Sequence, residues 1–162
     1  MDVYHRLTQA IHPAVDQYLV LTHEQRTRGR LKALSDSGEE VRLFLERGKT
    51  LLPGDLLRSE CGKIIEIRAA VEEVMLASCD DWLTFSRACY HLGNRHVKIE
   101  VGERQLKITP DHVLQQMLQQ LGLQVSLVQD AFIPESGAYA KGHSHAGHSH
   151  HDEHDHSHAH QH

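Results

Sequence analysis

The sequence predicts an α+β protein with an N-terminal all-β domain, a small barrel or sandwich, a C-terminal βαββαβ domain, and a disordered histidine-rich tail. Three observations support this class. Short strand-like runs separated by turn residues fill the first 72 residues, helical periodicity first appears after Asp80, and ten of the last twenty residues are histidine. We therefore expect domains at residues 1–72 and 73–141, with the tail at residues 142–162.

Strand-forming residues dominate the N-terminal part. The predicted strands, rich in β-branched or alternating apolar residues, are residues 18–21, 30–34, 41–45 and 64–67. Residues 35–38, Ser-Asp-Ser-Gly, have turn chemistry and join two of these strands into a hairpin. No helix is expected in this part of the chain.

The C-terminal domain begins with a predicted strand at residues 73–77. A helix follows, with Asp80 as its N-cap and a stop signal at Gly93-Asn94. Alternating residues predict two further strands, 97–101 and 105–108. Thr109-Pro110 is typical of a helix start, and residues 124–128 form the last predicted strand. This order of elements is the ferredoxin-like arrangement.

Composition excludes several classes of function. The net charge is -5 with acidic and basic residues interspersed, so no basic face for nucleic acid is expected. The sequence has no apolar run long enough for a membrane span and no apolar signal core, which indicates a cytoplasmic protein. Serine-hydrolase and zincin motifs are missing, so neither of these two chemistries is suggested. The three cysteines show no C-x-x-C spacing and are expected to be free thiols.

The tail carries the strongest chemical signal. Neutral imidazole binds nickel, copper, zinc and cobalt, and several imidazoles on one flexible chain reinforce one another. The candidate ligands in the tail are His143, His145, His148, His150, His151, His154, His156, His158, His160 and His162. Many are two residues apart, so that an extended chain presents them on one side as a chelating pair. A purification tag and a pH-responsive solubility segment are the alternatives.

Three histidines of the predicted C-terminal domain are further candidates. His91 and His96 flank the helix stop at Gly93-Asn94, and His112 occupies the third position of the helix that starts at Thr109. The positive end of a helix dipole disfavours a protonated ring at such a position, which leaves the imidazole available to a metal. Spacing alone does not show that the three histidines converge.

Several ordered motifs resemble the family of urease accessory proteins called UreE. The string at residues 87–96, Arg-Ala-Cys-Tyr-His-Leu-Gly-Asn-Arg-His, resembles the family's signature, as does Asp-His-Val-Leu at residues 111–114. Residues 132–139 are similar to the family's domain end, and residues 21–55 carry matching positions of its N-terminal domain. Together these motifs extend over roughly residues 18–140.

The resemblance implies a site and a role. Such proteins form cytosolic homodimers through their C-terminal domains, and His96 of each subunit would bind one interfacial nickel. Some members have a second site made by the equivalent of His112 and a histidine two residues earlier, where this chain has Pro110. His91 would be a secondary ligand, favoured for copper.

The implied function is a metallochaperone that delivers Ni(II) for assembly of the urease active site. Such a role makes and breaks no covalent bond, so the resemblance implies that the protein is not an enzyme. The implied partners are the urease accessory GTPase and the urease pre-activation complex. Cu(II), Zn(II) and Co(II) are further candidate ions, because divalent affinity at imidazole sites follows a general order in which copper exceeds nickel. Two alternatives stay open: nickel storage or detoxification without delivery, and a peptide-binding module whose tail is incidental.

Overall fold

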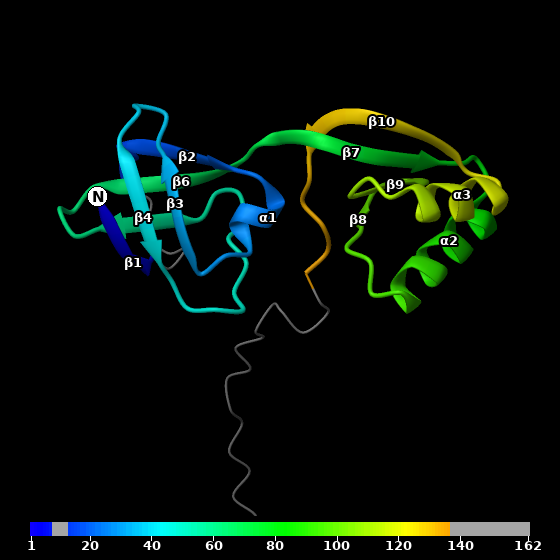
Figure 1. Ribbon diagram of the computed structural model, residues 1–162, viewed down its shortest axis with the longest axis horizontal. Coiled ribbons are helices and arrows are strands. Elements are labelled where there is room, and N and C mark those ends of the chain that lie inside the picture. Colours follow the sequence, from blue (N-terminus) through cyan, green and yellow to red (C-terminus); the bar gives the residue numbers. More distant parts are fainter. Residues whose placement is uncertain (8–12, 137–162) are drawn as a thin grey trace, which may run out of the picture.

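The computed structural model describes residues 1–7 and 13–136, and its N-terminal part is a six-stranded sheet (Figure 1). The strands are β1 (Asp2–Arg6), β2 (Gln17–Leu21), β3 (Arg30–Leu34), β4 (Glu40–Phe44), β5 (Leu56–Ser59) and β6 (Ile64–Ala69). Their order across the sheet is β2-β6-β5-β1-β4-β3. The hairpin of β3 and β4 is confirmed. β1 and β5 were not predicted.

The sheet curls into a barrel-like form around an apolar core. Val3, Leu19, Leu43, Leu57 and Ile65 belong to this core, and each is at most 1% exposed. The turn after β3 lies against β2, because the Asp36 N–H donates to the carbonyl of Tyr18 at 3.0 Å and the Asp36 carboxylate accepts from the Tyr18 N–H at 2.9 Å. The two edge strands are thereby brought together.

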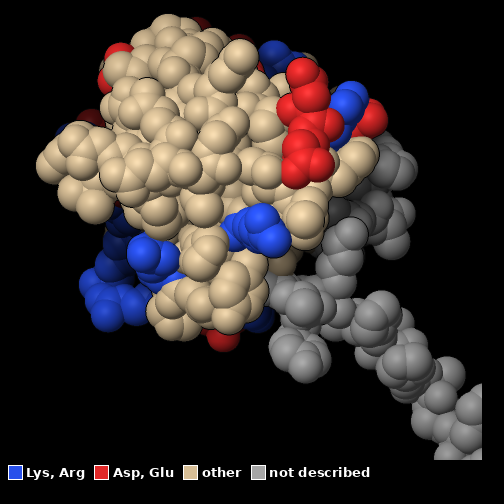
Figure 2. All heavy atoms as spheres, turned by 90° about the vertical axis from the view of Figure 1, so that its right-hand side faces the viewer, with Lys and Arg blue, Asp and Glu red and all other residues tan. Residues whose placement is uncertain are grey.

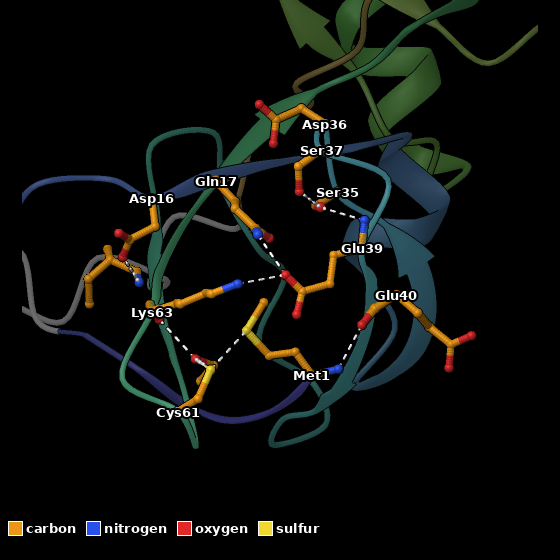
Figure 3. A network of polar contacts seen from close by, with 12 residues as sticks. Met1, Asp16, Gln17, Ser35, Asp36, Ser37, Glu39, Glu40, Cys61 and Lys63 are labelled. Atoms are coloured by element: carbon orange, nitrogen blue, oxygen red, sulfur yellow. Dashed lines mark hydrogen bonds and ion pairs between the residues drawn. The ribbon is translucent and has the colours of Figure 1, made fainter.

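A polar network reinforces this closure (Figure 3). The Glu39 carboxylate, just before β4, accepts hydrogen bonds from the Gln17 amide of β2 at 2.7 Å and from Lys63 Nζ at 2.8 Å. Lys63 immediately precedes β6, so one carboxylate connects three segments of the barrel. The hydrogen bond from Lys63, then that from Gln17, holds the pKa of Glu39 below its usual range.

A short helix interrupts the strands, contrary to the sequence prediction. α1 (His23–Arg26) follows β2 directly. Thr22 and Gln25 form a capping box: the Thr22 hydroxyl accepts from the Gln25 N–H at 3.3 Å, and the Gln25 side chain accepts from the Thr22 N–H at 2.9 Å. Four residues are too few for apolar periodicity to reveal, but the reciprocal cap stabilises the turn.

The C-terminal part has the predicted element order β-α-β-β-α-β. Its elements are β7 (Val71–Ser78), α2 (Trp82–Asn94), β8 (Glu100–Val101), β9 (Gln105–Ile108), α3 (His112–Gln120) and β10 (Gln124–Ala131). The strands are antiparallel in the order β10-β7-β9-β8, and both helices lie on the same side of this sheet (Figure 1). Phe85, Leu92, Leu106 and Leu118 are buried between helices and sheet. In the two described ranges, no helix has the length and apolar character that a bilayer crossing requires.

Three predicted boundaries were wrong for physical reasons. Asp81, not Asp80, caps α2 by accepting from the Thr84 N–H at 2.7 Å. The N-cap of α3 is Asp111 rather than Thr109, since its carboxylate accepts from two N–H groups of the first turn. The predicted strand at residues 97–101 shortens to Glu100–Val101, because Val97 completes the end of α2.

Phe132 connects the end of the C-terminal sheet with α1 of the N-terminal part. Phe132 follows β10 directly and is 1% exposed. Its carbonyl accepts a hydrogen bond from the guanidinium of Arg26, which is itself 1% exposed. The ring of His23 packs edge-on against the Phe132 ring at 5.2 Å between centroids, and burial followed by the Arg26 charge lowers the pKa of that histidine. The N-terminal domain thus holds the chain at Phe132, directly after β10.

We expect Phe132→Ala to lower the free energy of unfolding by about 3–5 kcal/mol, the usual cost of deleting a fully buried aromatic ring. Urea unfolding followed by circular dichroism measures the change. Leu34→Ala is the matched control, because Leu34 is 66% exposed and its truncation should change stability by less than about 0.5 kcal/mol. Equal losses in the free energy of unfolding for the two substitutions would contradict a stabilising role for the Phe132 ring.

Candidate metal centre

His96 lies in the turn that ends α2. Arg95 is the C-cap, and His96 follows with a φ of 55°, in the left-handed region. The His96 N–H donates to the carbonyl of Gly93 at 2.9 Å, and the Val97 N–H donates to the carbonyl of Leu92 at 3.2 Å. These two bonds define a Schellman motif, in which residue 96 takes the position that glycine usually occupies.

A histidine at this position is costly for the fold. The left-handed conformation places Cβ close to a carbonyl oxygen, at about 1–2 kcal/mol for a residue other than glycine. Such strained positions cluster at functional sites. The side chain of His96 is exposed, so it buries no surface that would offset the strain. Among the described residues other than glycine, only His96 and Arg104 have a positive φ, and this backbone position makes His96 a candidate functional residue.

The electrostatics of the turn favour a cation. The last carbonyls of a helix carry a partial negative charge, and a positive ion beyond them is stabilised. His91 lies in the last turn of α2 and is half-buried, with its ring edge-on to the Tyr90 ring at 5.5 Å. Arg95 donates to the His91 carbonyl at 3.1 Å, which satisfies one of those carbonyls. His91 and His96 thus lie at the same helix end.

His112 is the first residue of α3 rather than its third, and it is exposed. Among the described residues, no three His, Cys, Asp or Glu side chains gather in a metal-binding cluster. The structure therefore does not bring His91, His96 and His112 into one centre within a single chain. Cys61, Cys79 and Cys89 are free thiols. The ten tail candidates, His143, His145, His148, His150, His151, His154, His156, His158, His160 and His162, lie outside the described residues.

The end of the molecule that carries α2 and α3 presents a broad face without charged side chains, and acidic and basic residues lie at its borders (Figure 2). Leu83 and Tyr90 of α2 are 58% and 66% exposed, and Val113 of α3 is 59% exposed. Residues seven apart on a helix lie on nearly the same side, so Leu83 and Tyr90 share one face of α2. Apolar residues gathered in this way are typical of an interaction surface.

Comparison with known proteins decides the family. The chain matches two family models, the N-terminal domain of the UreE urease accessory protein over residues 3–70 and its C-terminal domain over residues 72–162. Among its relatives is the urease accessory protein UreE of Marinomonas sp. (strain MWYL1), 59% identical over 145 residues that cover 90% of this chain and 99% of the relative. The chain belongs to the UreE family. The UreE proteins of Alteromonas mediterranea and Psychromonas ingrahamii are 46% and 41% identical, over 88% and 90% of this chain and 92% and 97% of their own lengths.

Membership of the UreE family confirms the resemblance drawn from the motifs. A urease accessory protein has a role in the maturation of urease. The signature around residues 87–96 covers the last turns of α2 and the strained cap residue His96. The signature motif of this UreE chain therefore ends at one of the two non-glycine residues that have a positive φ in the described part of the chain.

Two residues that hold the chain after β10 could not be recognised from the sequence. Arg26 lies within residues 21–55, which the sequence only matched to the family, and its burial against Phe132 depends on a contact between residues 106 positions apart. Glu100, whose carboxylate holds the chain after β10, looked like the polar member of an alternating strand. A charged residue in a short strand gives no local signal of such a contact.

Proposed function

We propose that this UreE protein binds Ni(II) as cargo and delivers it for assembly of the urease active site. The observation that carries the proposal is His96, an exposed imidazole held in a strained left-handed position at the negative end of α2. Neutral imidazole is a good ligand for nickel. A glycine would make the same turn at lower cost, so the side chain accounts for the residue.

The proposed site is shared between two copies of the chain. A twofold interface is self-complementary, so the face of α2 that carries Leu83 and Tyr90 would pack against the same face of a partner. Because His96 follows this helix, the two His96 rings would approach the axis and bind one nickel between them. His91 and His112 are proposed as secondary ligands, with a role for copper at His91. The sheet order and the two helices on one face support naming this domain ferredoxin-like, at residues 73–141.

The tail of residues 142–162 would collect ions for this site. Half of its last twenty residues are histidine, and Asp152, Glu153 and Asp155 add negative charge. A free imidazole becomes protonated as the pH falls below about 6.5, and a protonated ring cannot bind a metal ion. The tail would therefore hold nickel at neutral pH and lose it on acidification. Cu(II), Zn(II) and Co(II) would compete for the same ligands.

Delivery requires partners, which we propose to be the urease accessory GTPase and the urease pre-activation complex in the cytoplasm. By its resemblance to a peptide-binding domain, the barrel-like N-terminal domain at residues 1–72 would contact a partner protein. A second candidate function is nickel storage, which the histidine content of the tail favours by itself. Storage would need neither His96 nor the GTPase.

Activation of apo-urease separates the two functions. Purified protein loaded with nickel is mixed with the accessory GTPase and apo-urease, and urease activity is followed. We expect His96→Ala to reduce activation strongly, because the ion would no longer be presented at the shared site. The matched control is His5→Ala, an equivalent change at an exposed histidine of β1. Activation by all three proteins that is no higher than with the same amount of free Ni(II) would favour storage.

A further inference from the structure

The segment Phe132–Glu135, which we call the exit strap, connects β10 to the chain that leads into the tail. Its first residue is pinned by the N-terminal domain. Arg26 donates to the Phe132 carbonyl and also, at 3.3 Å, to the carbonyl of Leu51. Since Arg26 and Phe132 are both 1% exposed, this end of the exit strap is held in a dry contact, where a charge-assisted hydrogen bond is strong.

The C-terminal domain holds the rest of the exit strap. The Ile133 N–H donates to Glu100 Oε2 at 2.7 Å, and the Glu135 N–H donates to the carbonyl of Ile99 at 2.8 Å. The exit strap thus bonds to the carbonyl of Ile99 and the carboxylate of Glu100. Both residues lie within residues 97–101, where the sequence predicted a longer strand. Neither contact is needed to complete the four-stranded sheet.

Lys107 orients the carboxylate that receives the exit strap. Its ammonium lies 2.7 Å from Glu100 Oε1 and 2.9 Å from Asp130 Oδ2, and it donates to the carbonyl of Ala131 at 3.0 Å. Burial acts to lower the pKa of Lys107, but the hydrogen bonds to Glu100 and Asp130 outweigh it and raise that pKa above its usual value. Glu100 therefore has one oxygen fixed by Lys107 and the other free to accept from Ile133.

These contacts place Glu135 near His96. Glu135 is bonded to Ile99, which is three residues after His96, and three residues span at most about 11 Å. The first tail histidine, His143, is eight residues after Glu135, a length of chain that can reach at most about 28 Å. The reach exceeds the separation, so geometry permits a tail histidine to contact an ion at His96 of the same chain.

We propose that Glu100 and Arg26 are positioning residues that fix the root of the histidine-rich tail beside the His96 turn, so that nickel passes from tail to His96 within one chain. The inference rests on the proposed nickel binding by the tail and by His96. Its physical basis is effective concentration: a ligand tethered at short range encounters its target far more often than one tethered from a distant point. Releasing the exit strap would lengthen the tether and move its origin towards the end of β10.

The test compares Glu100→Ala and Glu100→Gln in the full chain. One Ni(II) is added per two chains, and its arrival at His96 is followed by paramagnetic loss of the amide NMR signals of Gly93 and Val97. We expect the rate in the parent protein to be independent of protein concentration. Glu100→Ala should slow it about two- to five-fold, as a longer tether predicts, whereas Glu100→Gln retains an oxygen acceptor for Ile133 and should preserve the rate.

A third variant separates the exit strap from the fold. Ile133→Pro removes the N–H that Glu100 accepts from but leaves the ion pair of Glu100 with Lys107 intact, so it should slow transfer as Glu100→Ala does. The same substitutions are then made in a chain truncated after Gly142, which keeps every described residue. There they should leave the rate of nickel arrival unchanged.

Every outcome of these experiments either supports or overturns the positioning role of the exit strap. An unchanged rate for both Glu100→Ala and Ile133→Pro in the full chain would overturn the inference, as would an equal slowing in the truncated chain, which would assign Glu100 to the folding of the His96 turn. Failure of the truncated parent to bind nickel at His96 at all would overturn the proposed function together with this inference. Slowing that requires the tail supports both.

Discussion

Truncation after Gly142 is expected to lower the nickel stoichiometry from several ions to about one per pair of chains. The truncation removes ten histidines and leaves His91, His96 and His112 in place. A multi-histidine chain binds by successive weak contacts, each raising the effective concentration of the next, so its loss should remove all but the shared ion. Titration calorimetry at neutral pH measures the number of ions.

The acidic residues of the tail supply a matched control. Replacing Asp152, Glu153 and Asp155 by their amides keeps every imidazole and the length of the chain, so the number of bound ions should stay close to that of the parent. An unchanged stoichiometry after truncation would show that the tail is not the reservoir. A large loss in the amide variant would transfer the binding role from imidazole to carboxylate.

His96→Gly is expected to abolish the remaining ion and at the same time stabilise the fold. Glycine relieves about 1–2 kcal/mol of left-handed strain, while its greater freedom in the unfolded chain costs about 0.5–1 kcal/mol. The net gain of about 0–1.5 kcal/mol corresponds to a rise in melting temperature of at most about 6 °C for a chain of this size. Thermal unfolding of the truncated, metal-free proteins measures the shift.

A gain in stability with a loss of nickel would show that binding, not folding, accounts for the histidine. His112→Gly is the control, because His112 is the first residue of a helix and its backbone needs no left-handed conformation. This variant should gain no stability and should retain the shared ion. A destabilised His96→Gly protein, or one that still binds nickel in the truncated chain, would contradict the assignment of His96.

The strand pattern was predictable wherever pairing is local. The hairpin of β3 and β4 and the hairpin of β8 and β9 lie close together in sequence, and turn residues mark them. β1 was missed because its neighbours, β4 in parallel and β5 in antiparallel, come from about 40 and 55 residues away. Its sequence, Asp-Val-Tyr-His-Arg, is mostly polar, and only Val3 enters the core.

The candidate site was predictable as chemistry but not as geometry. The motif around His96 identified the residue, yet the left-handed cap is visible only in the backbone, because asparagine at position 94 already looked like a sufficient helix stop. The position of His112 shifted by two residues because Asp111 was a better cap than Thr109. Contacts such as Arg26 with Phe132 join distant segments, which no local pattern encodes.

Native mass spectrometry of the chain truncated after Gly142, supplied with Ni(II), tests the central claim most directly. If the exposed face of α2 joins two copies and presents His96 from each, the spectrum should show two chains with one nickel ion, and His96→Ala should remove that ion. A single chain without bound nickel would contradict the account.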